Sequence, residues 1–478
     1  MADALIACLE HGQHALDEGR TDAAIQAFRE AHQLAPDQLG IVLALAYAYR
    51  LADDVLTARE TLVAASRRRP TTDATLDFQF GAALLEVGAA REAAASFARV
   101  MRANPSDPAP IGAQAGARRA VGDLDAAWAL IIEALRRAPE QPAFLLTAAQ
   151  IRHDMGDADG ALSYLDQAER IRPHHPTTRL QRAYTTLLQG PSIAAWELFE
   201  ARALPRPATN ARPWNGESLD GASILVAAEQ GIGDQLQFAR FIRLLHAFEP
   251  SRIVVECHPQ LVSLFRAPDI EIVERGNAPE TDWYVPLLSL PHRLQLGHRI
   301  DGVVPYMMFG NFSAPRLALD VPALPLHLGL VWAGNPAFAG HATRDFERAL
   351  LPALSRLDFV KWHALQQGEA LPDTLENIVR APVLTDWQHT ARALLQLDGI
   401  VTTDTGIAHL AAGLGLPTWV LLQHVPDWRW GMHDGAWPWY PSARLLRQTT
   451  PGNWSSVVEQ LGTSLADFAM QRKSERGQ

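Results

Sequence analysis

The stretch VTTDTGIAHLAAGLGLP, from Val401 to Pro417, has the pattern of a buried strand followed by a turn and a helix. Its first residues are β-branched, and Asp404, Thr405 and Gly406 form the turn. Apolar residues then recur at helical spacing until a glycine and a proline end the pattern. A helix that begins in this way directs free backbone N–H groups and the positive end of its dipole at the turn, which suits a phosphate.

Strands and helices alternate over the whole C-terminal half, as they do in doubly wound parallel sheets. We expect a linker at 208–221, one Rossmann-like half at 222–320 and a second at 321–478. Ligands of open parallel sheets bind beyond the carboxyl ends of the strands, so two such halves predict a cleft between them. The expected strands are 223–228, 252–257, 270–273, the run from Leu326 that Trp332 and Asn335 close, 359–366 and 400–402.

The N-terminal 207 residues contain a repeat with a period of about 34 residues. Small residues recur in the first helix of each repeat, and a glycine recurs in the turn, with Asp53 as the exception. This pattern matches tetratricopeptide repeats, and it predicts an α superhelix of about six repeats over 1–207, the last degenerate at Arg202. The concave side of such an array usually takes a peptide or protein segment. The repeating prolines are Pro36, Pro70, Pro105, Pro139, Pro173 and Pro207.

Length and charge restrict the class of protein. A chain of 478 residues exceeds the roughly 250 to 300 residues at which single cores stop growing. The formal net charge of -11 argues against nucleic acid as the main partner, because nucleic-acid binding relies on clustered positive charge. No stretch approaches the roughly 20 apolar residues of a membrane span, and Cys8 and Cys257 show no disulfide or metal-ligand spacing. We therefore expect a cytoplasmic protein without a membrane span.

Two acidic pairs resemble metal-binding motifs of some glycosyltransferases but fall in the turns between repeat helices. They are Asp123 with Asp125 and Asp157 with Asp159. Aspartate is favoured at such positions as a helix N-cap. We interpret both pairs as caps and expect neither a metal nor another cofactor.

Several motifs of the C-terminal half resemble, in order, bacterial tetratricopeptide-linked glycosyltransferases related to the heptosyltransferase family. The resemblance implies a GT-B fold, a nucleotide-sugar donor held by 321–478, an acceptor met by 222–320, and inverting chemistry without an obligatory metal. It also implies that the helical stretch 454–468 packs back on the first half. The joined architecture is similar to O-GlcNAc transferase and to transferases of bacterial flagellin. The motifs are EQGIGDQLQFARFIRLL, PLLSLP, GLVWAGNP with TRDF, ALQQGE, TDTGIAHLAAGLGLPTWVLL and PDWRWG with PWYPSARLLRQ.

The resemblance places the candidate base at Asp234, which matches the position of the proposed catalytic aspartate of heptosyltransferases. Gly231 and Gly233 let the chain turn tightly around it. The alternative role for Asp234 is a helix N-cap, and Glu229 at the end of the preceding strand is a rival base.

The donor phosphate is expected at the turn of the opening motif. The amides of Thr405 and Gly406 and the Thr405 hydroxyl would stabilise the leaving group, and Asp404 would bond backbone amides or a ligand hydroxyl. In relatives a Lys or Arg after the GLVWAGNP strand faces the phosphate, and Arg344 occupies the matching place. His409 is expected either to bond the donor or to be a buried structural histidine.

Four further residues are candidate ligand contacts. Asn335 could bond a sugar or phosphate oxygen, and Gln366 a nucleobase or ribose. Asp427 and Trp430 belong to an aromatic loop that is expected to be either a rigid core or a wall of the donor-sugar site.

These observations leave three functions open. The first is an inverting glycosyltransferase that modifies Ser or Thr of a protein captured by the repeats, with flagellin as one candidate. The second is a transferase acting on lipopolysaccharide or another glycan, and the third is a repeat scaffold with an inactive transferase half. Several nucleotide sugars would present the same phosphate to the Asp404 turn.

Overall fold

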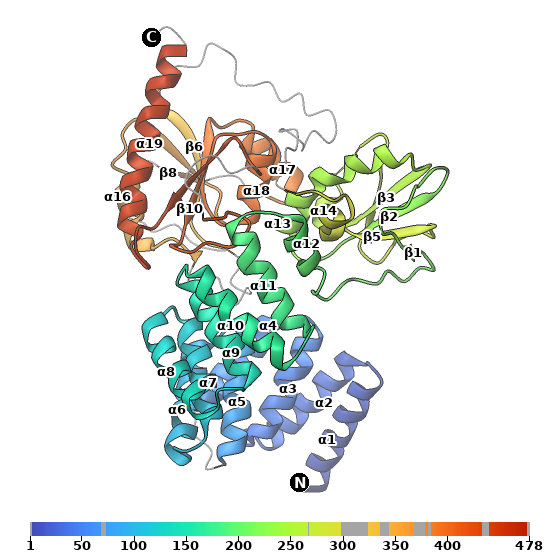
Figure 1. Cartoon of the computed structure of the whole chain (residues 1–478), viewed down its shortest axis with the longest axis vertical. Coiled ribbons are helices and arrows are strands. Elements are labelled where there is room, and N and C mark those ends of the chain that lie inside the picture. The colour runs from blue at the N-terminus through green and yellow to red at the C-terminus, as the bar shows by residue number, and fades with distance from the viewer. Residues whose placement is uncertain are drawn as a thin grey trace. The chain divides into compact units, whose positions relative to one another are not determined.

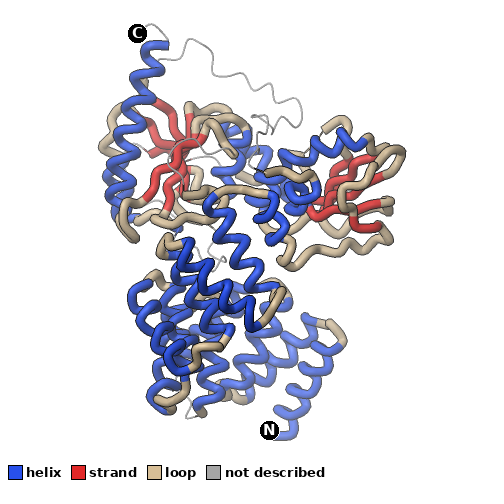
Figure 2. The backbone as a smooth tube through the Cα atoms, in the orientation of Figure 1, coloured by secondary structure: helices blue, strands red, loops and turns tan. Residues whose placement is uncertain are grey.

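The computed structural model describes residues 2–67, 73–265, 267–297, 324–334, 344–367, 378–380, 384–432 and 439–475. The chain divides into two compact units, one holding the residues up to Thr178 and the other beginning at Arg179. The first unit is built from helices, and the second contains two sheets with helices around them (Figures 1 and 2).

The described part of the first unit consists of successive helix pairs, one pair for each predicted repeat up to residue 171. Neighbouring helices pack together along the chain. This arrangement confirms a tetratricopeptide-like helical array in the N-terminal region. The helices are α1 (Ala2–Asp17), α2 (Thr21–Leu34), α3 (Leu39–Leu51), α4 (Val55–Ser66), α5 (Ala74–Glu86), α6 (Ala90–Ala103), α7 (Pro108–Ala120), α8 (Leu124–Arg137), α9 (Pro142–Asp154) and α10 (Ala158–Ile171).

The turn within each pair contains a residue with positive φ at the place where the sequence repeats glycine. Such a backbone costs an L-residue roughly 1–2 kcal/mol and costs glycine nothing. Asp53, the exception to the glycine pattern, keeps the same conformation with φ of 61°. The glycines are Gly19, Gly88, Gly122 and Gly156, with φ between 70° and 82°.

The repeated small residues in the first helices allow close contact with a phenylalanine of the second helix. A Cβ added to Gly12 would lie 2.6 Å from the Phe28 ring, and one added to Gly81 would lie 2.8 Å from the Phe97 ring. Both rings are buried. The position therefore leaves no room for a larger side chain, as the sequence pattern predicts.

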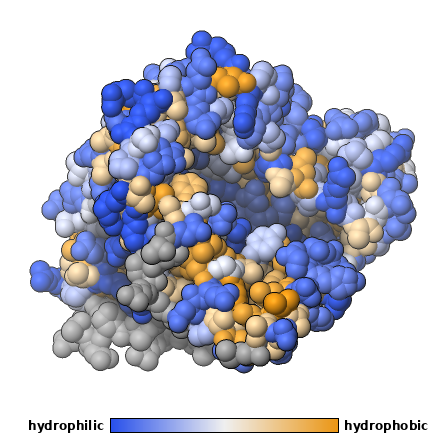
Figure 3. Space-filling view, turned by 90° about the horizontal axis from the view of Figure 1, so that it is seen from below, coloured by the Kyte–Doolittle hydropathy of each residue, from blue (hydrophilic) through white to orange (hydrophobic). Residues whose placement is uncertain are grey.

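First helices of neighbouring repeats also contact one another, in the pairs α3–α5, α5–α7 and α7–α9. Elements on the inner side of a curved array lie closest together, so we assign the first helices to the concave surface. Tyr47 and Leu51, one turn apart on α3, are 50% and 52% exposed. The face seen in Figure 3 is predominantly hydrophilic with smaller hydrophobic areas.

The first sheet of the second unit has the order β1-β5-β2-β3-β4, and all its strands are parallel. Its central strand β2 is almost entirely buried, as the apolar run SILVA predicts. The chain order reverses at β2 and β5, which makes their carboxyl ends a topological switch point. The elements are β1 (Arg212–Pro213), β2 (Ser223–Ala227), α13 (Ile232–Phe238), a 3₁₀ helix (Ala239–Phe248), β3 (Arg252–Cys257), β4 (Glu271–Glu274), β5 (Trp283–Pro286) and α14 (Leu290–Arg293).

The second sheet has the order β11-β10-β9-β6-β7-β8 and is also parallel. Its chain order reverses between β6 and β9, so their carboxyl ends form the second switch point. Two parallel α/β halves are thus present. The elements are β6 (Leu326–Val331), α16 (Leu351–Leu354), β7 (Val360–Ala364), β8 (Ile378–Arg380), α17 (Trp387–Leu394), β9 (Gly399–Thr403), α18 (Gly406–Gly413), β10 (Thr418–Leu422), β11 (Ala443–Arg447) and α19 (Trp454–Glu475).

The C-terminal helix α19 packs on the second sheet, which corrects the expectation that it would cover the first half. Its buried residues Trp454, Leu461 and Phe468 share a core with Leu328 and Trp419. The indole N–H of Trp419 also donates to Ser464 on α19 at 2.8 Å. An apolar helical stripe predicts that a helix is covered by a sheet but does not specify which one.

Two segments predicted to lie outside the α/β halves contribute to the core of the second unit. The expected linker supplies edge strand β1 and the buried Trp214, which packs edge-on against Phe248. The last predicted repeat supplies α11 (Pro176–Gln189) and α12 (Ile193–Phe199). Trp196 of α12 packs against Phe238, Trp428 and Trp439 at centroid distances of 5.8 to 6.1 Å.

Replacing Gly81 by alanine is expected to destabilise the array relative to the same change at Gly116. Both residues lie inside first helices, where alanine gains about 1 kcal/mol in helix propensity. A Cβ at Gly116 has only Leu85 at 3.9 Å, whereas a Cβ at Gly81 overlaps the buried Phe97 ring, and overpacking costs roughly 1–3 kcal/mol. Urea unfolding measures the difference, and equal gains in both variants would contradict the tight contact.

Candidate functional site

Two turns meet in the second unit, one from each sheet. The first follows β2 and leads into α13, the second follows β9 and leads into α18, and the two helices are in contact (Figure 1). A Cβ added to Gly233 would lie 3.2 Å from the His409 ring and 3.5 Å from Gly406 Cα. Gly406 in turn lies against Trp387, whose ring is 2.8 Å from the place of its missing Cβ. Because these glycines have no side chain, the turns at the carboxyl ends of β2 and β9 can lie this close to each other.

Asp234 is the third residue of α13 and joins the two halves electrostatically. Its Oδ2 accepts the N–H of Gly231 at 3.0 Å in a capping box, and its Oδ1 forms an ion pair with Arg429. Arg429 also donates to Asp427 at 2.8 Å. Burial alone lowers the pKa of Arg429, but the two carboxylates raise it above its ordinary value. Asp234 thus acts in helix capping and holds a cation from the other half.

Asp404 occupies the carboxyl end of β9 and is held from two sides. Its Oδ2 accepts Arg344 Nη1 at 3.1 Å, and its Oδ1 accepts the indole N–H of Trp430 at 2.8 Å. Burial raises the pKa of this carboxyl group, and the Arg344 charge opposes that rise. The structure therefore brings Arg344 to the Asp404 turn. Trp430 is fully buried, so it orients Asp404 and does not offer a ring face to a ligand.

His409 lies one turn into α18 and is enclosed by aromatic rings. Its Nδ1 is 2.8 Å from the Tyr440 hydroxyl, and its ring stacks on Trp430 with centroids 5.0 Å apart. Burial and the nearby Arg429 and Arg240 charges lower its pKa to about 3. The imidazole is therefore neutral at pH 7, which fits the structural alternative and leaves the positive charge of the site to arginine.

Glu229 is fully engaged in a buried ion pair. Its two carboxylate oxygens accept Arg202 Nε at 2.9 Å and Nη2 at 2.7 Å, and the N–H of Leu288 donates to Oε1 at 2.8 Å. Arg202 also reaches Ser289 and Glu200. The Glu229 side chain is 5% exposed and that of Asp234 is 18% exposed, so Asp234 is the more accessible candidate base.

The remaining predicted contacts have different environments. Gln366 Oε1 accepts the N–H groups of Trp332 and Ala333, at 3.1 and 3.0 Å, so its side chain fixes the loop after β6. The Thr405 hydroxyl lies 2.9 Å from that of Thr402 and does not cap α18. Asn335 lies outside the described residues.

The first aspartate of each acidic pair is a helix N-cap, as predicted, and the second, Asp125 or Asp159, lies in the first turn of the same helix. Asp123 accepts the N–H of Ala126, and Asp157 accepts that of Gly160 at 2.9 Å. Within the described part of the chain, no group of three or more His, Cys, Asp or Glu side chains could hold a metal ion. None of the described helices combines the length and the apolar character that crossing a membrane requires.

Three residues of the site were not singled out from the sequence. Arg429 pairs with Asp234, and the Arg240 guanidinium lies 4.5 Å from the ring of Tyr440, the partner of His409. In the motif PDWRWG, Arg429 lies between two tryptophans and two residues after Asp427. That pattern was the sequence signal for Arg429. Arg240 resembles any polar residue of an amphipathic helix, so the sequence carried no signal for it.

Comparison with known families and proteins supports the repeat assignment. The tetratricopeptide repeat family profile matches residues 15–76. Protein FlbA of Caulobacter vibrioides is 23% identical over 328 residues, which cover 60% of this chain and 54% of FlbA. The chain thus spans about half the length of that relative. It contains tetratricopeptide repeats, and its similarity to FlbA is weak.

Similar solved structures match this chain with TM-scores of 0.33 or less. MamA is 18% identical, with a TM-score of 0.30, over 36% of this chain and 93% of MamA. A tetratricopeptide repeat protein from Parabacteroides merdae is 13% identical, with a TM-score of 0.33, over 41% of this chain and 84% of its own. YrrB, described as a tetratricopeptide repeat protein with an unusual peptide-binding site, is 16% identical, with a TM-score of 0.29, over 36% and 88%. Likenesses at these scores carry no argument about function.

The stability of the second unit is expected to fall as the pH drops below about 6.5. Unfolded His409 binds a proton near that pH, whereas folded His409 binds one only near pH 3. The folded state therefore holds fewer protons in this window, and each pH unit removes up to about 1.4 kcal/mol. In His409→Gln, the part of the pH dependence of the unfolding free energy that comes from His409 should be absent.

Urea unfolding between pH 7.5 and 4.5, followed by tryptophan fluorescence, measures this slope. The signal reports mainly on the second unit because Trp128 is the one tryptophan before residue 179. His389→Gln, at a half-exposed position on α17, is the control and should keep the wild-type slope. A wild-type slope in His409→Gln would contradict the buried, neutral imidazole.

Proposed function

We propose that this chain is an inverting, metal-independent glycosyltransferase with a GT-B fold. It transfers a sugar from a nucleotide-sugar donor to Ser or Thr of a protein held by the repeats, and flagellin is a candidate acceptor. The observation that carries the proposal is the meeting of Asp234, from one half, with the Asp404–Gly406 turn and two arginines of the other.

In this proposal Asp234 accepts the proton of the acceptor hydroxyl, and the amides of Thr405 and Gly406 stabilise the departing phosphate. Arg344 and Arg429 would supply the positive charge that a metal supplies elsewhere. Both arginines now pair with carboxylates of the site. A bound diphosphate would compete for these arginines and would release Asp234 Oδ1 for proton transfer.

The acceptor side of the proposal rests on the repeat array. Stacked tetratricopeptide repeats are protein-binding scaffolds whose concave surface accepts extended segments. Tyr47 and Leu51 expose apolar surface on a first helix, which we assign to that side. Side chains of this kind pack against a bound polypeptide, so the array is proposed to capture the acceptor protein.

A scaffold without catalytic activity is the second candidate, and one observation favours it. The acids and arginines of the site satisfy one another, in Asp234 with Arg429 and in Asp404 with Arg344. Such pairs also occur as purely structural links, because buried charges require partners. In this alternative the array binds its partner and the α/β unit transfers no sugar.

Asp234→Asn is expected to lower sugar transfer by about 10²-fold or more, since a general base typically contributes 10²–10⁴-fold. It should leave nucleotide binding at least as strong as in wild type, because the competing carboxylate of the Asp234–Arg429 pair is removed. Arg344→Gln should instead weaken nucleotide binding by about 10- to 100-fold, because a hydrogen bond to a charged group is worth roughly 1.5–3 kcal/mol. Mass spectrometry of flagellin and other proteins incubated with a panel of nucleotide sugars measures transfer. Thermal shift with free nucleotides measures binding.

The control is Arg356→Gln, an exposed arginine of the same half, which should behave as wild type in both assays. Sugar found on a lipid or glycan, and on no protein, would assign the acceptor to another class. If Asp234→Asn is fully active, Asp234 is not the base. If wild type binds no nucleotide but still binds a protein through the repeats, the scaffold is the correct function.

A further inference from the structure

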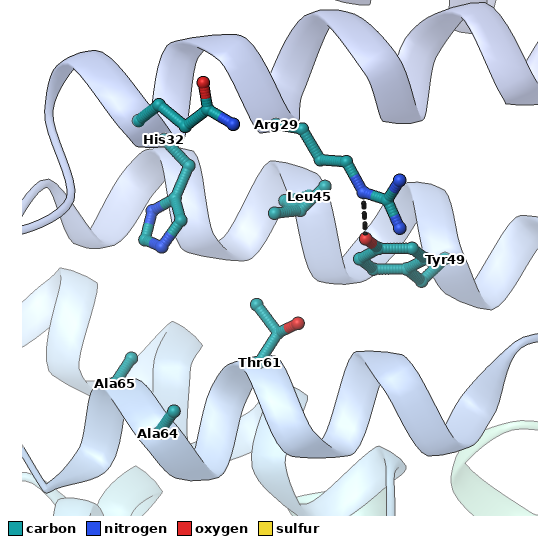
Figure 4. A pocket seen from close by; sticks show the side chains of 8 residues that line it. Arg29, His32, Leu45, Tyr49, Thr61, Ala64 and Ala65 are labelled. Atoms are coloured by element: carbon teal, nitrogen blue, oxygen red, sulfur yellow. Dashed lines mark hydrogen bonds between the residues drawn. The ribbon is translucent and has the colours of Figure 1, made fainter.

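The first unit contains a cavity of about 330 Å³ between α2, α3 and α4 (Figure 4). Arg29 and His32 extend from α2, Leu45 and Tyr49 from α3, and Thr61 from α4. One wall is polar, and the rest is formed by Leu45 and two alanines of α4. The complete lining is Arg29, His32, Gln33, Leu45, Tyr49, Thr61, Ala64 and Ala65.

This cavity is separate from the concave surface of the array. Its walls α2 and α4 are second helices of successive repeats, whereas first helices line the concave side. On α3 the cavity-lining Leu45 and Tyr49 are buried, and Tyr47 and Leu51, two residues further on, are half exposed. A shift of two residues moves to the opposite side of a helix. The cavity and the exposed apolar side of α3 are thus two different surfaces.

The polar wall of the cavity is built to donate hydrogen bonds. Arg29 Nε donates to the Tyr49 hydroxyl, and the Arg29 guanidinium carbon lies 5.3 Å from the centre of the Tyr49 ring. This fixes the guanidinium and leaves its two Nη groups for a planar anion. Because the Tyr49 oxygen accepts from Arg29, its own hydrogen can be donated to a ligand. Both groups can therefore bond the same carboxylate.

The charge of Arg29 has no close partner among the described residues of the array. Among the residues that the structure describes, none forms an ion pair with Arg29 within 4.0 Å, and Asp54 feels the Arg29 charge only at longer range. Asp54 itself caps α4 by accepting the N–H of Thr57 at 3.0 Å. The Thr61 hydroxyl donates its hydrogen to the Thr57 carbonyl. It therefore offers the cavity a hydrogen-bond acceptor and no further donor. Arg29 thus remains the cationic element of the cavity.

We propose that this cavity binds a carboxylate carried on a short hydrocarbon stem. Arg29 and Tyr49 would hold the carboxylate, and Leu45, Ala64 and Ala65 would contact the stem. The volume lies at the small end of ligand sites, which is enough for an acidic side chain of a peptide or for a free dicarboxylate. The apolar walls favour such a ligand over inorganic phosphate. The site operates independently of the proposed transfer reaction.

Fluorescence anisotropy of a labelled tetraglutamate peptide with the full-length protein at low salt tests this site. Wild type is expected to bind tetraglutamate and not tetraglutamine. Arg29→Gln should weaken the affinity at least tenfold, and Tyr49→Phe severalfold. Ala64→Phe keeps the charge but fills the cavity from an exposed position, so it should weaken binding as strongly as Arg29→Gln. Circular dichroism and melting temperature verify that each variant is folded.

The matched control is Arg102→Gln, which removes an exposed arginine from the second helix α6 and should bind as wild type. Displacement of the peptide by glutarate shows that the cavity takes the carboxylate itself. Peptide binding that resists glutarate assigns the site to an acidic segment, and glutarate binding without peptide binding assigns it to a free dicarboxylate. The proposal is overturned if neither probe binds, if Arg29→Gln and Ala64→Phe bind normally, or if Arg102→Gln weakens binding equally.

Discussion

The second unit depends on one close approach, that of Gly233 in α13 to Gly406 and His409 in α18. A Cβ at Gly233 would lie 3.2 Å from the His409 ring, which is so tight that the ring or its helix would have to shift by a few tenths of an ångström. Because both helices begin at this contact, the free N–H groups and positive dipole ends of two turns converge on one region. The positions of Asp234 and Asp404 follow from this contact, since each residue belongs to one of the turns.

The charges around this contact form a connected set of ion pairs. Three carboxylates, from Asp234, Asp404 and Asp427, meet two arginines, Arg344 and Arg429. Taking such groups out of water is costly unless they are paired, so each pair stabilises the folded unit mainly by avoiding an isolated buried charge. Neutral His409 adds no further charge to the set. An anionic ligand would interact with the arginines first, because they are the only groups of the set that attract it.

Local patterns predicted much of the fold because they act within a few residues. Repeat glycines predicted the turns between paired helices, and apolar runs predicted parallel strands such as β2 and β9. The two turns of the site were also predicted, since each follows a strand. Pairings between distant segments were not. Arg429 and Asp234 are 195 residues apart, and the repeat pattern gave no reason to connect Arg202 with Glu229.

The segment after Arg179 matches the last predicted repeat in sequence and belongs to the compact unit that contains the two sheets. Trp196 of α12 packs against Trp428, the neighbour of Arg429, and the carbonyl of Leu188 accepts the N–H of Met432 in the same loop. Arg202 holds Glu229 at the start of the turn that contains Asp234. Both partners of the Asp234–Arg429 ion pair are therefore supported by residues that match a repeat in sequence but fold within the α/β core. Within α12, Trp196 contacts both Phe238 in the helix of Asp234 and Trp428 beside Arg429, so truncating Trp196 would loosen both sides of that ion pair at once.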